Sequence, residues 1–363
     1  MAVDTQALLA ALQAVTDPNT GKDFVSTKAL KNLQAEYGDV SFDVELGYPA
    51  KSQMPALRRA LIEAAKSVTG VENVSVNMQT RIVPHAVQRG VQLLPGVKNI
   101  IAVASGKGGV GKSTTTVNLA LALAAEGARV GILDADIYGP SQPMMMGIEG
   151  RPESVDGQTM EPLENYGVQV TSIGFLVDKD EAMIWRGPMA TQALEQLLRQ
   201  TNWKDLDYLI VDMPPGTGDI QLTLSQRVPM TGAVIVTTPQ DIALLDARKG
   251  IKMFEKVGVP ILGIVENMAV YCCPNCGHTE HIFGAEGGKK MAAEYGMDFL
   301  GELPLNMSIR VQADSGHPTV VSDPDGEIAG IYKTVARQVA IKIADKAKDY
   351  SSKFPSIKIS KDT

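Results

Sequence analysis

Cysteine is scarce in this sequence and is confined to one place. The 363 residues contain three cysteines, Cys272, Cys273 and Cys276. Three clustered thiols do not make the disulfide framework of a secreted domain, so the sequence predicts a reducing compartment. Such a cluster instead indicates a soft metal or an iron–sulfur cluster, and these usually take four ligands. The source of a fourth ligand is therefore the first question that the sequence raises.

The chain also lacks a surplus of basic residues and any long apolar run. Lys and Arg total 34 and Asp and Glu total 41, which gives a formal net charge of −7. A general nucleic-acid-binding protein normally carries a basic surplus. No apolar run reaches the ~20 residues that span a bilayer, and the first residues have no basic segment or cleavage signal of a secretory leader. We therefore expect a cytoplasmic protein with neither nucleic acid nor membrane as partner.

The length and the changes of pattern along the chain predict two domains. Residues 1–78 read as a small α+β domain, with a first helix capped by Asp4 and a second helix that has Pro55 near its first turn. Residues 79–98 contain proline and glycine without a sustained period and are predicted to be a linker. The last residues, 351–363, are polar and lysine-rich, and we expect a flexible tail.

Residues 99–350 alternate between short apolar runs and helical stretches. The runs include "NIIAVAS", "LDYLIVDMPP", "GAVIVTTP" and "PILGIVENM", and helical patterns such as "KSTTTVNLALALAAEG" lie between several of them. Continuous apolar strands that alternate with helices are typical of a parallel sheet covered on both faces. The predicted fold class is therefore α/β, a P-loop-type domain with a mostly parallel sheet, preceded by the small α+β domain.

A phosphate-binding loop is the most specific motif in the chain. The stretch "GKGGVGKS" fits G-x-x-x-x-G-K-[ST] in full, after one apolar strand and before a helix. Its glycines allow the backbone N–H groups to point at a phosphate, and the helix N-terminus adds a favourable dipole. We expect Lys112 to reach the β- and γ-phosphates of ATP and Ser113 to bind Mg²⁺. The residues assigned to the nucleotide are Gly106, Lys107, Gly108, Gly109, Val110, Gly111, Lys112, Ser113 and Thr114.

Carboxylates follow two other strands, where α/β sheets bind their ligands. Asp134 and Asp136 end the strand in "LDADIYGPS", and one of them is expected to orient water or Mg²⁺; we assign this catalytic role to Asp136. Asp212 ends "DYLIVD" and is a Walker-B-like ligand for Mg²⁺. The following "PPGTGD" predicts a switch segment with Gly216 near the γ-phosphate. Lys107, inside the loop, is a second cation for the triphosphate of its own chain or of a facing subunit.

These motifs together resemble a known family. "KGGVGKST", "DADIYGPS" and "DMPPGTGD" are similar to the deviant-Walker-A ATPases of the MinD and ParA class. "DIYGPSQP", "WRGPM" (Trp185 to Met189), "VENM" and "CPNCG" resemble the Mrp/ApbC family of iron–sulfur cluster carrier ATPases. The resemblance implies a homodimer with ATP near the interface, and it implies that Lys107 crosses to the partner chain. It also implies that Asn267 and the Pro304 region contact the adenine. Asn306 departs from the family, which often has Asp there.

Three chemistries compete for the cysteine cluster. Zinc could be bound by Cys273, Cys276, His278 and His281, although the spacing to either histidine is shorter than in usual zinc fingers. Thiol–disulfide exchange is less favoured, because the motif does not start a thioredoxin-like βαβ unit. A shared iron–sulfur cluster explains the incomplete set, since two chains supply four thiolates around a two-fold axis. The family resemblance favours this third interpretation, a shared iron–sulfur cluster.

The prediction for the whole chain is a slow ATPase that carries a [4Fe–4S] cluster. Cys273 and Cys276 of two chains bind the bridging cluster, which the homodimer transfers to apo iron–sulfur proteins. A positioning switch of the MinD/ParA type and a zinc-stabilised NTPase are the alternatives. The sequence leaves open the identity of the recipients, the step that hydrolysis drives, the role of the small domain, and whether Cys272 participates.

Overall fold

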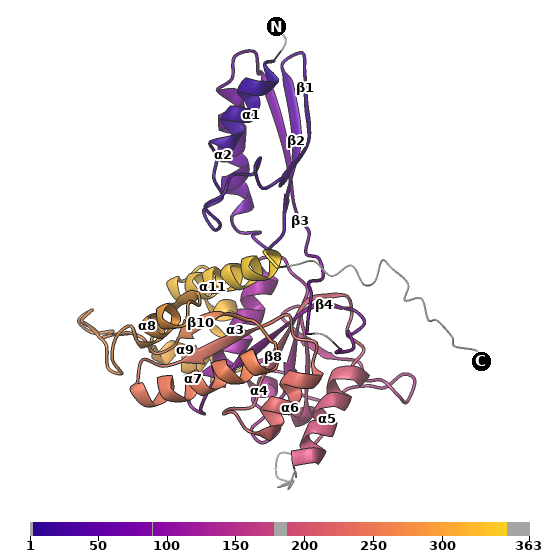
Figure 1. Ribbon diagram of the computed structural model, residues 1–363, viewed down its shortest axis with the longest axis vertical. Helices are drawn as coiled ribbons and strands as arrows, with labels where there is room; N and C mark the ends of the chain where they lie inside the picture. Colours follow the sequence, from indigo (N-terminus) through magenta and orange to yellow (C-terminus); the bar gives the residue numbers. More distant parts are fainter. Residues whose placement is uncertain (1–2, 89, 178–186, 347–363) are drawn as a thin grey trace.

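The protein consists of a small domain that stands on a larger one (Figure 1). The computed structural model describes residues 3–88, 90–177 and 187–346. Residues Trp185 and Arg186 of the "WRGPM" motif and the tail at 351–363 lie outside the described residues, as do the last residues of the predicted ATPase domain. No helix of the described part is long and apolar enough to cross a bilayer.

The small domain is a three-stranded sheet with two helices on one face. Its elements are α1 (Thr5–Gln13), β1 (Leu30–Glu36), β2 (Asp39–Leu46), α2 (Met54–Lys66) and β3 (Asn73–Thr80). β1 pairs antiparallel with β2, and β2 pairs parallel with β3. The Asp4 carboxylate accepts hydrogen bonds from the N–H groups of Gln6 and Ala7, so the predicted N-cap is confirmed. The sequence analysis did not predict β1, because this strand lies at the edge of the sheet and its polar composition does not give a strand pattern.

The large domain contains an eight-stranded sheet in the order β13-β10-β9-β4-β8-β5-β7-β6. Every neighbouring pair is parallel except β6 and β7, so the predicted α/β class with a mostly parallel sheet is correct. The elements are β4 (Val97–Ala104), α3 (Lys112–Ala125), β5 (Val130–Asp134), α4 (Gln142–Met145), β6 (Leu163–Asn165), β7 (Val168–Ser172), η1 (Ile173–Phe175), α5 (Gly187–Gln200), β8 (Leu206–Asp212), α6 (Asp219–Arg227), β9 (Gly232–Thr237), α7 (Asp241–Lys256), β10 (Ile261–Glu266), β11 (Tyr271–Cys272), β12 (Thr279–Glu280), α8 (Gly287–Glu294), β13 (Phe299–Glu302), α9 (Met307–Asp314), α10 (Thr319–Ser322) and α11 (Glu327–Ala344).

Two apolar cores cover the two faces of this sheet. On one face α3 and α11 pack over the strands, and this core continues into the small domain. On the other face α5, α6, α7 and α8 form the second core. Strands β8 and β9 are buried along their whole length because helices cover both faces, which is why they read as unbroken apolar runs.

The helix that starts at the phosphate-binding loop ends at the small domain. The backbone carbonyl of Glu126, just after α3, accepts from the Lys51 N–H at 3.1 Å. Its buried carboxylate accepts from the Ser52 hydroxyl at 2.6 Å and from the Arg337 guanidinium at 2.8 Å. A helix of 14 residues is about 21 Å long, so the small domain and the phosphate-binding loop lie at opposite ends of α3. The division into 1–78, 79–98 and 99–350 stays a proposal, and β3 and β4 each extend into its linker.

Candidate functional site

The phosphate-binding loop runs from the end of β4 to the start of α3 and is closely packed. A Cβ at Gly106 would lie 2.1 Å from the backbone carbon of Asp246 on α7. A Cβ at Gly111 would lie 2.1 Å from the Asn267 amide nitrogen, and Gly111 also has a left-handed φ of +81°. Only glycine fits these two positions without moving the backbone. The loop is therefore held from α7 and from the end of β10.

Lys112 is buried at the N-terminus of α3 between two carboxylates. Its Nζ lies 2.6 Å from Asp212 Oδ1, 3.8 Å from Asp136 Oδ2 and 3.1 Å from the Ser113 hydroxyl. Asp212 is fully buried and ends β8, and Asp136 is only partly exposed after β5. The structure thus brings together Lys112, Ser113, Asp136 and Asp212, the residues predicted to meet a magnesium–nucleotide complex.

Asp134 differs from its neighbour Asp136 because both of its carboxylate oxygens already accept hydrogen bonds from the protein. One of its carboxylate oxygens accepts from the Gln142 N–H at 3.1 Å and from the Ser172 hydroxyl at 3.0 Å. The other accepts from the Asp136 N–H at 3.3 Å. Complete burial, and next the nearby Asp212 charge, raise the pKa of Asp134 to about 7. Of the two carboxylates, only Asp136 keeps a partly open position beside Lys112.

The raised pKa of Asp134 predicts a pH-dependent stability. The folded pKa lies above the unfolded one, so the stabilising contribution is complete below the unfolded pKa and is lost as pH rises through about 7. We expect the free energy of unfolding of the nucleotide-free protein to fall between about pH 4 and 7 and to level off above that, and Asp134→Asn to flatten this slope by up to about 1.4 kcal/mol per pH unit. Urea unfolding across that range measures it; equal slopes for both proteins contradict the assignment.

Lys107 and Gly216 both lie next to Ser105, at the start of the phosphate-binding loop. The Lys107 carbonyl accepts from the Ser105 hydroxyl at 2.8 Å, while its ammonium group makes no ion pair with any residue that the structure describes. The Gly216 N–H donates to the Ser105 carbonyl at 3.1 Å, which places the predicted switch segment beside the loop. The Lys107 side chain is therefore available to a phosphate.

Sequence reasoning missed three side chains that hold the carboxylates. Gln142 is fully buried and donates from Nε2 to Asp212 Oδ2 at 2.9 Å and to the Ser113 carbonyl at 3.1 Å. The Thr116 hydroxyl donates to Asp212 Oδ1 at 3.1 Å. Gln142 lies within the motif "DIYGPSQP", and this motif could have identified it as a site residue. No motif pointed to a site role for Thr116 or Ser172.

The residues predicted to contact adenine lie at the ends of β10 and β13. Asn267 is buried and donates from Nδ2 to the Val110 carbonyl at 2.9 Å, so its amide holds the phosphate-binding loop. Pro304 follows β13 and is partly buried beside this segment. Asn306 caps α9 by accepting from the Ser308 N–H at 2.8 Å. An Asp would accept the same bond, so the departure from the family leaves this cap intact.

The cysteines lie in an exposed hairpin formed by β11 and β12. The Cys273 N–H donates to the His278 carbonyl at 2.8 Å, and the Gly277 N–H donates to the Cys273 carbonyl at 2.9 Å. Hydrogen bonds from the Asn275 and Cys276 N–H groups, and then from the Cys276 thiol, lower the pKa of the Cys273 thiol. Cys273 and Cys276 lie three positions apart on the tight turn between β11 and β12, whereas the Cys272 Sγ contacts the Gly277 carbonyl at 3.7 Å.

The histidines of the zinc alternative do not complete this pair. The His281 Nδ1 lies 2.7 Å from the Ala269 carbonyl, on the stem of the loop. Among the residues that the structure describes, no three His, Cys, Asp or Glu side chains converge as metal ligands would. A single chain therefore presents the Cys273 and Cys276 thiols on one turn, and the described residues give no support to a four-ligand zinc site.

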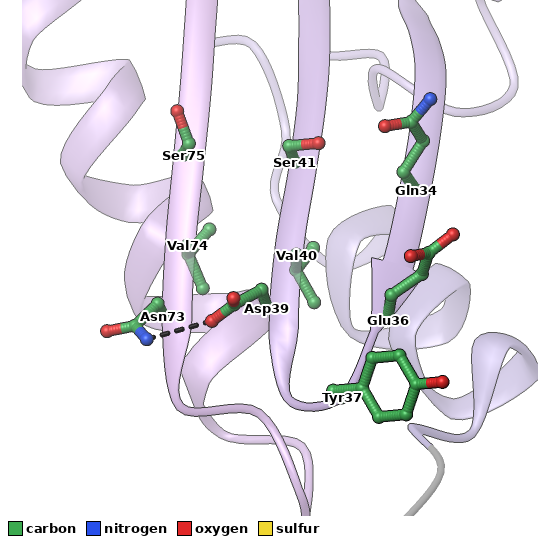
Figure 2. A pocket seen from close by; sticks show the side chains of 9 residues that line it. All are labelled: Gln34, Glu36, Tyr37, Asp39, Val40, Ser41, Asn73, Val74 and Ser75. Atoms are coloured by element: carbon green, nitrogen blue, oxygen red, sulfur yellow. Dashed lines mark hydrogen bonds between the residues drawn. The ribbon is translucent and has the colours of Figure 1, made fainter.

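The small domain holds a separate cavity of about 550 Å³ (Figure 2). Gln34, Glu36, Ser41 and Ser75 are among the polar side chains at this end of the sheet, and Asn73 donates to Asp39 at 2.8 Å. Its lining contains no cysteine, histidine or lysine. This end of β2 is remote from the end that meets α11, so the cavity takes no part in the nucleotide site.

The glycine-rich loop, the buried lysine and the strand-end carboxylates on a mostly parallel sheet define a P-loop NTPase. The comparisons with known proteins agree. Residues 96–340 match the ParA family, described as NUBPL iron-transfer P-loop NTPase, and residues 5–77 match a family described as iron–sulfur cluster assembly protein. The chain belongs to the NUBPL-type iron-transfer P-loop NTPase family.

Curated relatives are similar over most of the chain. It is 53% identical over 329 residues to the iron–sulfur cluster carrier protein of Escherichia coli, covering 90% of this chain and 89% of the relative. It is 61% identical over 275 residues to the carrier protein of Pseudomonas fragi, covering 75% and 96%. It is 56% identical over 248 residues to the mouse iron–sulfur cluster transfer protein NUBPL, covering 68% and 78%.

Solved structures share the fold of the large domain. The nucleotide-binding protein of Archaeoglobus fulgidus in complex with ADP aligns with a TM-score of 0.56 and 39% identity, over 64% of this chain and 90% of that one. The cell division ATPase MinD of Pyrococcus furiosus aligns with a TM-score of 0.50 and 22% identity, over 66% and 98%. The second likeness is one of fold alone.

Proposed function

We propose that this protein is an ATP-hydrolysing iron–sulfur cluster carrier that works as a homodimer. Cys273 and Cys276 of two chains hold a bridging [4Fe–4S] cluster as cargo, which passes to apo iron–sulfur proteins. The observation that carries this proposal is the position of Cys273 and Cys276 on one tight turn at an exposed hairpin tip, closed by the hydrogen bond from the Gly277 N–H to the Cys273 carbonyl. Four thiolates complete a four-iron cluster, and a two-fold axis supplies the second pair.

The distribution of exposed apolar side chains supports a dimer through the nucleotide face. Several large apolar side chains are at least half exposed on segments that follow the carboxyl ends of β5, β9 and β13: Tyr138, Met144, Ile242, Leu245 and Met307. Exposed apolar side chains gathered on one side of a protein favour a protein interface. The cysteine hairpin follows β10 at the same edge of the sheet, so a second copy there brings both thiol pairs into reach of each other.

The loop residues supply what ATP hydrolysis requires. Lys112 is held by Asp212 and Asp136, and a triphosphate competes with these carboxylates for its charge. Ser113, Asp136 and Asp212 offer the oxygen ligands that Mg²⁺ prefers, and bound Mg²⁺ neutralises charge on the phosphates. With Lys112 on the phosphates and Asp212 freed, the partly exposed Asp136 is placed to hold the attacking water.

Action of Lys107 across the dimer has a specific consequence. Lys107→Ala removes a cation from the partner's nucleotide but leaves Lys112 in place, so nucleotide affinity stays within about threefold while hydrolysis falls by about 100-fold. Mixing this variant with Lys112→Ala chains restores activity in part, because a mixed dimer contains one site with both lysines. Equal activity of the mixture and of either variant alone contradicts action in trans.

Anaerobic reconstitution with iron and sulfide tests the function itself. We expect a broad absorbance band in the visible region and bound iron and sulfide in equal amounts. We also expect an apo four-iron protein to gain its cluster faster from this protein than from free iron and sulfide. A protein that hydrolyses ATP but binds no cluster on reconstitution would instead favour a positioning switch of the MinD/ParA type. Zinc as the metal of anaerobically purified protein would overturn the carrier proposal.

A further inference from the structure

The cysteine hairpin belongs to a longer segment with a strained residue at each end. This segment, residues 268–286, is called the cysteine loop; it leaves the sheet after β10 and returns at the start of α8. Met268 and Glu286, its first and last residues, have left-handed φ angles of +55° and +59°. Such angles cost about 1–2 kcal/mol in residues other than glycine, and they cluster at clamps and switches. The loop therefore has a strained backbone conformation at both ends.

Glu266 closes the base of this loop. It is the last residue of β10, and its Oε2 accepts a hydrogen bond from the Gly288 N–H in the first turn of α8. This contact joins the two stems across 22 positions, and the segment between them contains all three cysteines. Further inside the loop, the His281 Nδ1 lies 2.7 Å from the Ala269 carbonyl. A Cβ at Gly287 would lie 2.7 Å from the Pro239 carbonyl, so glycine is needed for α8 to approach this closely.

The Glu266 carboxylate is incompletely satisfied. The side chain is fully buried, and its Oε1 has no hydrogen-bond partner among the described residues. Burial, together with the lesser effects of Glu302 and Glu286, raises the pKa of this carboxyl. An unsatisfied buried oxygen costs free energy. The carboxylate therefore holds the loop through Oε2 alone.

The residue next to Glu266 is tied to the phosphate-binding loop. Asn267 donates to the Val110 carbonyl at 2.9 Å, and its own N–H donates to the Thr237 carbonyl at 2.7 Å. The Leu305 N–H, one residue after the predicted adenine contact, donates to the Val270 carbonyl at 2.8 Å on the first stem. Glu266, the last residue of β10, and Asn267, which follows it, thus connect the nucleotide loop and the cysteine loop.

We infer that Glu266 is a positioning residue that latches the base of the cysteine loop and makes the loop respond to nucleotide bound at the neighbouring Val110–Asn267 contact. The role in cluster carriage rests on the proposed function, whereas the latch itself is a property of the chain without a cluster. Loss of the carboxylate frees the second stem, and the two thiols of each chain lose their fixed position relative to the partner.

Amide hydrogen exchange of the cluster-free, full-length protein tests the latch. We compare wild type, Glu266→Ala, Glu266→Gln and the control Glu280→Gln, with and without a non-hydrolysable ATP analogue. Glu280 lies exposed in the same loop. In Glu266→Ala we expect loop amides to exchange about tenfold faster, because the buried Gly288 N–H loses its acceptor. Glu266→Gln keeps an accepting oxygen and restores slow exchange; Glu280→Gln resembles wild type.

The response to nucleotide separates a latch from a merely structural residue. In wild type the analogue changes exchange in both the phosphate-binding loop and the cysteine loop. In Glu266→Ala the phosphate-binding loop stays protected by nucleotide and the cysteine loop no longer responds. A wild-type response in Glu266→Ala, or no response in wild type itself, overturns the inference. Failure of wild type to bind a cluster on reconstitution would sink the proposed function and leave this exchange result standing.

Discussion

Replacing Lys112 by Ala lowers ATP hydrolysis by at least about 100-fold. The lysine is the fixed cation of the phosphate-binding loop, and charge that develops on the phosphates during transfer goes unstabilised without it. Its ammonium group is buried and already oriented by Asp212 at 2.6 Å and Asp136 at 3.8 Å. Steady-state phosphate release at saturating ATP and Mg²⁺ measures the effect.

The chain offers a matched control for this substitution. Lys98 pairs with Asp207 at 2.6 Å near the start of β8, and Lys112 pairs with Asp212 at the end of the same strand. Lys98→Ala therefore also breaks a lysine–aspartate pair between the chain segments around β4 and β8, but far from the phosphates. We expect it to keep hydrolysis within about twofold, because this pair lies at the opposite end of β8 from the phosphate-binding loop. Hydrolysis by Lys112→Ala at the rate of Lys98→Ala contradicts the site.

Replacing Cys273 or Cys276 by Ser abolishes the stable cluster, and replacing Cys272 does not. The two thiols lie on one tight turn and are proposed to bind one cluster, and the lowered pKa of the Cys273 thiol favours the thiolate that binds iron. Cys272 contacts the Gly277 carbonyl instead and serves as the matched control within the same hairpin. Iron per chain after anaerobic reconstitution should reach background in Cys273→Ser and Cys276→Ser. Equal loss in Cys272→Ser points to three ligands per chain.

The fold class could be predicted from the sequence because it depends on local patterns: apolar runs in buried strands and a contiguous loop motif. The strands β8 and β9 are apolar throughout, and the phosphate-binding loop appears as one contiguous motif between a strand and a helix. The edge strand β1 gave no such signal, since half its side chains face water and its register shifts between Lys31 and Gln34. A bulged, polar edge strand has neither alternation nor an apolar run.

The side-chain contacts that orient the site could not be predicted from the sequence, because they join residues far apart in the chain. Gln142 reaches Asp212 across 70 positions, and Glu126 joins Ser52 and Arg337 across 74 and 211 positions. Such pairs depend on how the elements pack, and no local spacing encodes them. The roles of Asp134 and Asp136 likewise separate only in the structure, which shows that one carboxylate is saturated and the other is open.

The central claim, that the ligands missing from one chain come from a second chain, is tested most directly by the intact mass of the reconstituted protein. Native mass spectrometry under anaerobic conditions should show two chains with one four-iron cluster, and two irons per chain on average. Removing the cluster with a chelator should shift the mass toward single chains, since ligand bonds across an interface add to association. A single chain that holds four irons, or a dimer that holds one cluster per chain, contradicts the account.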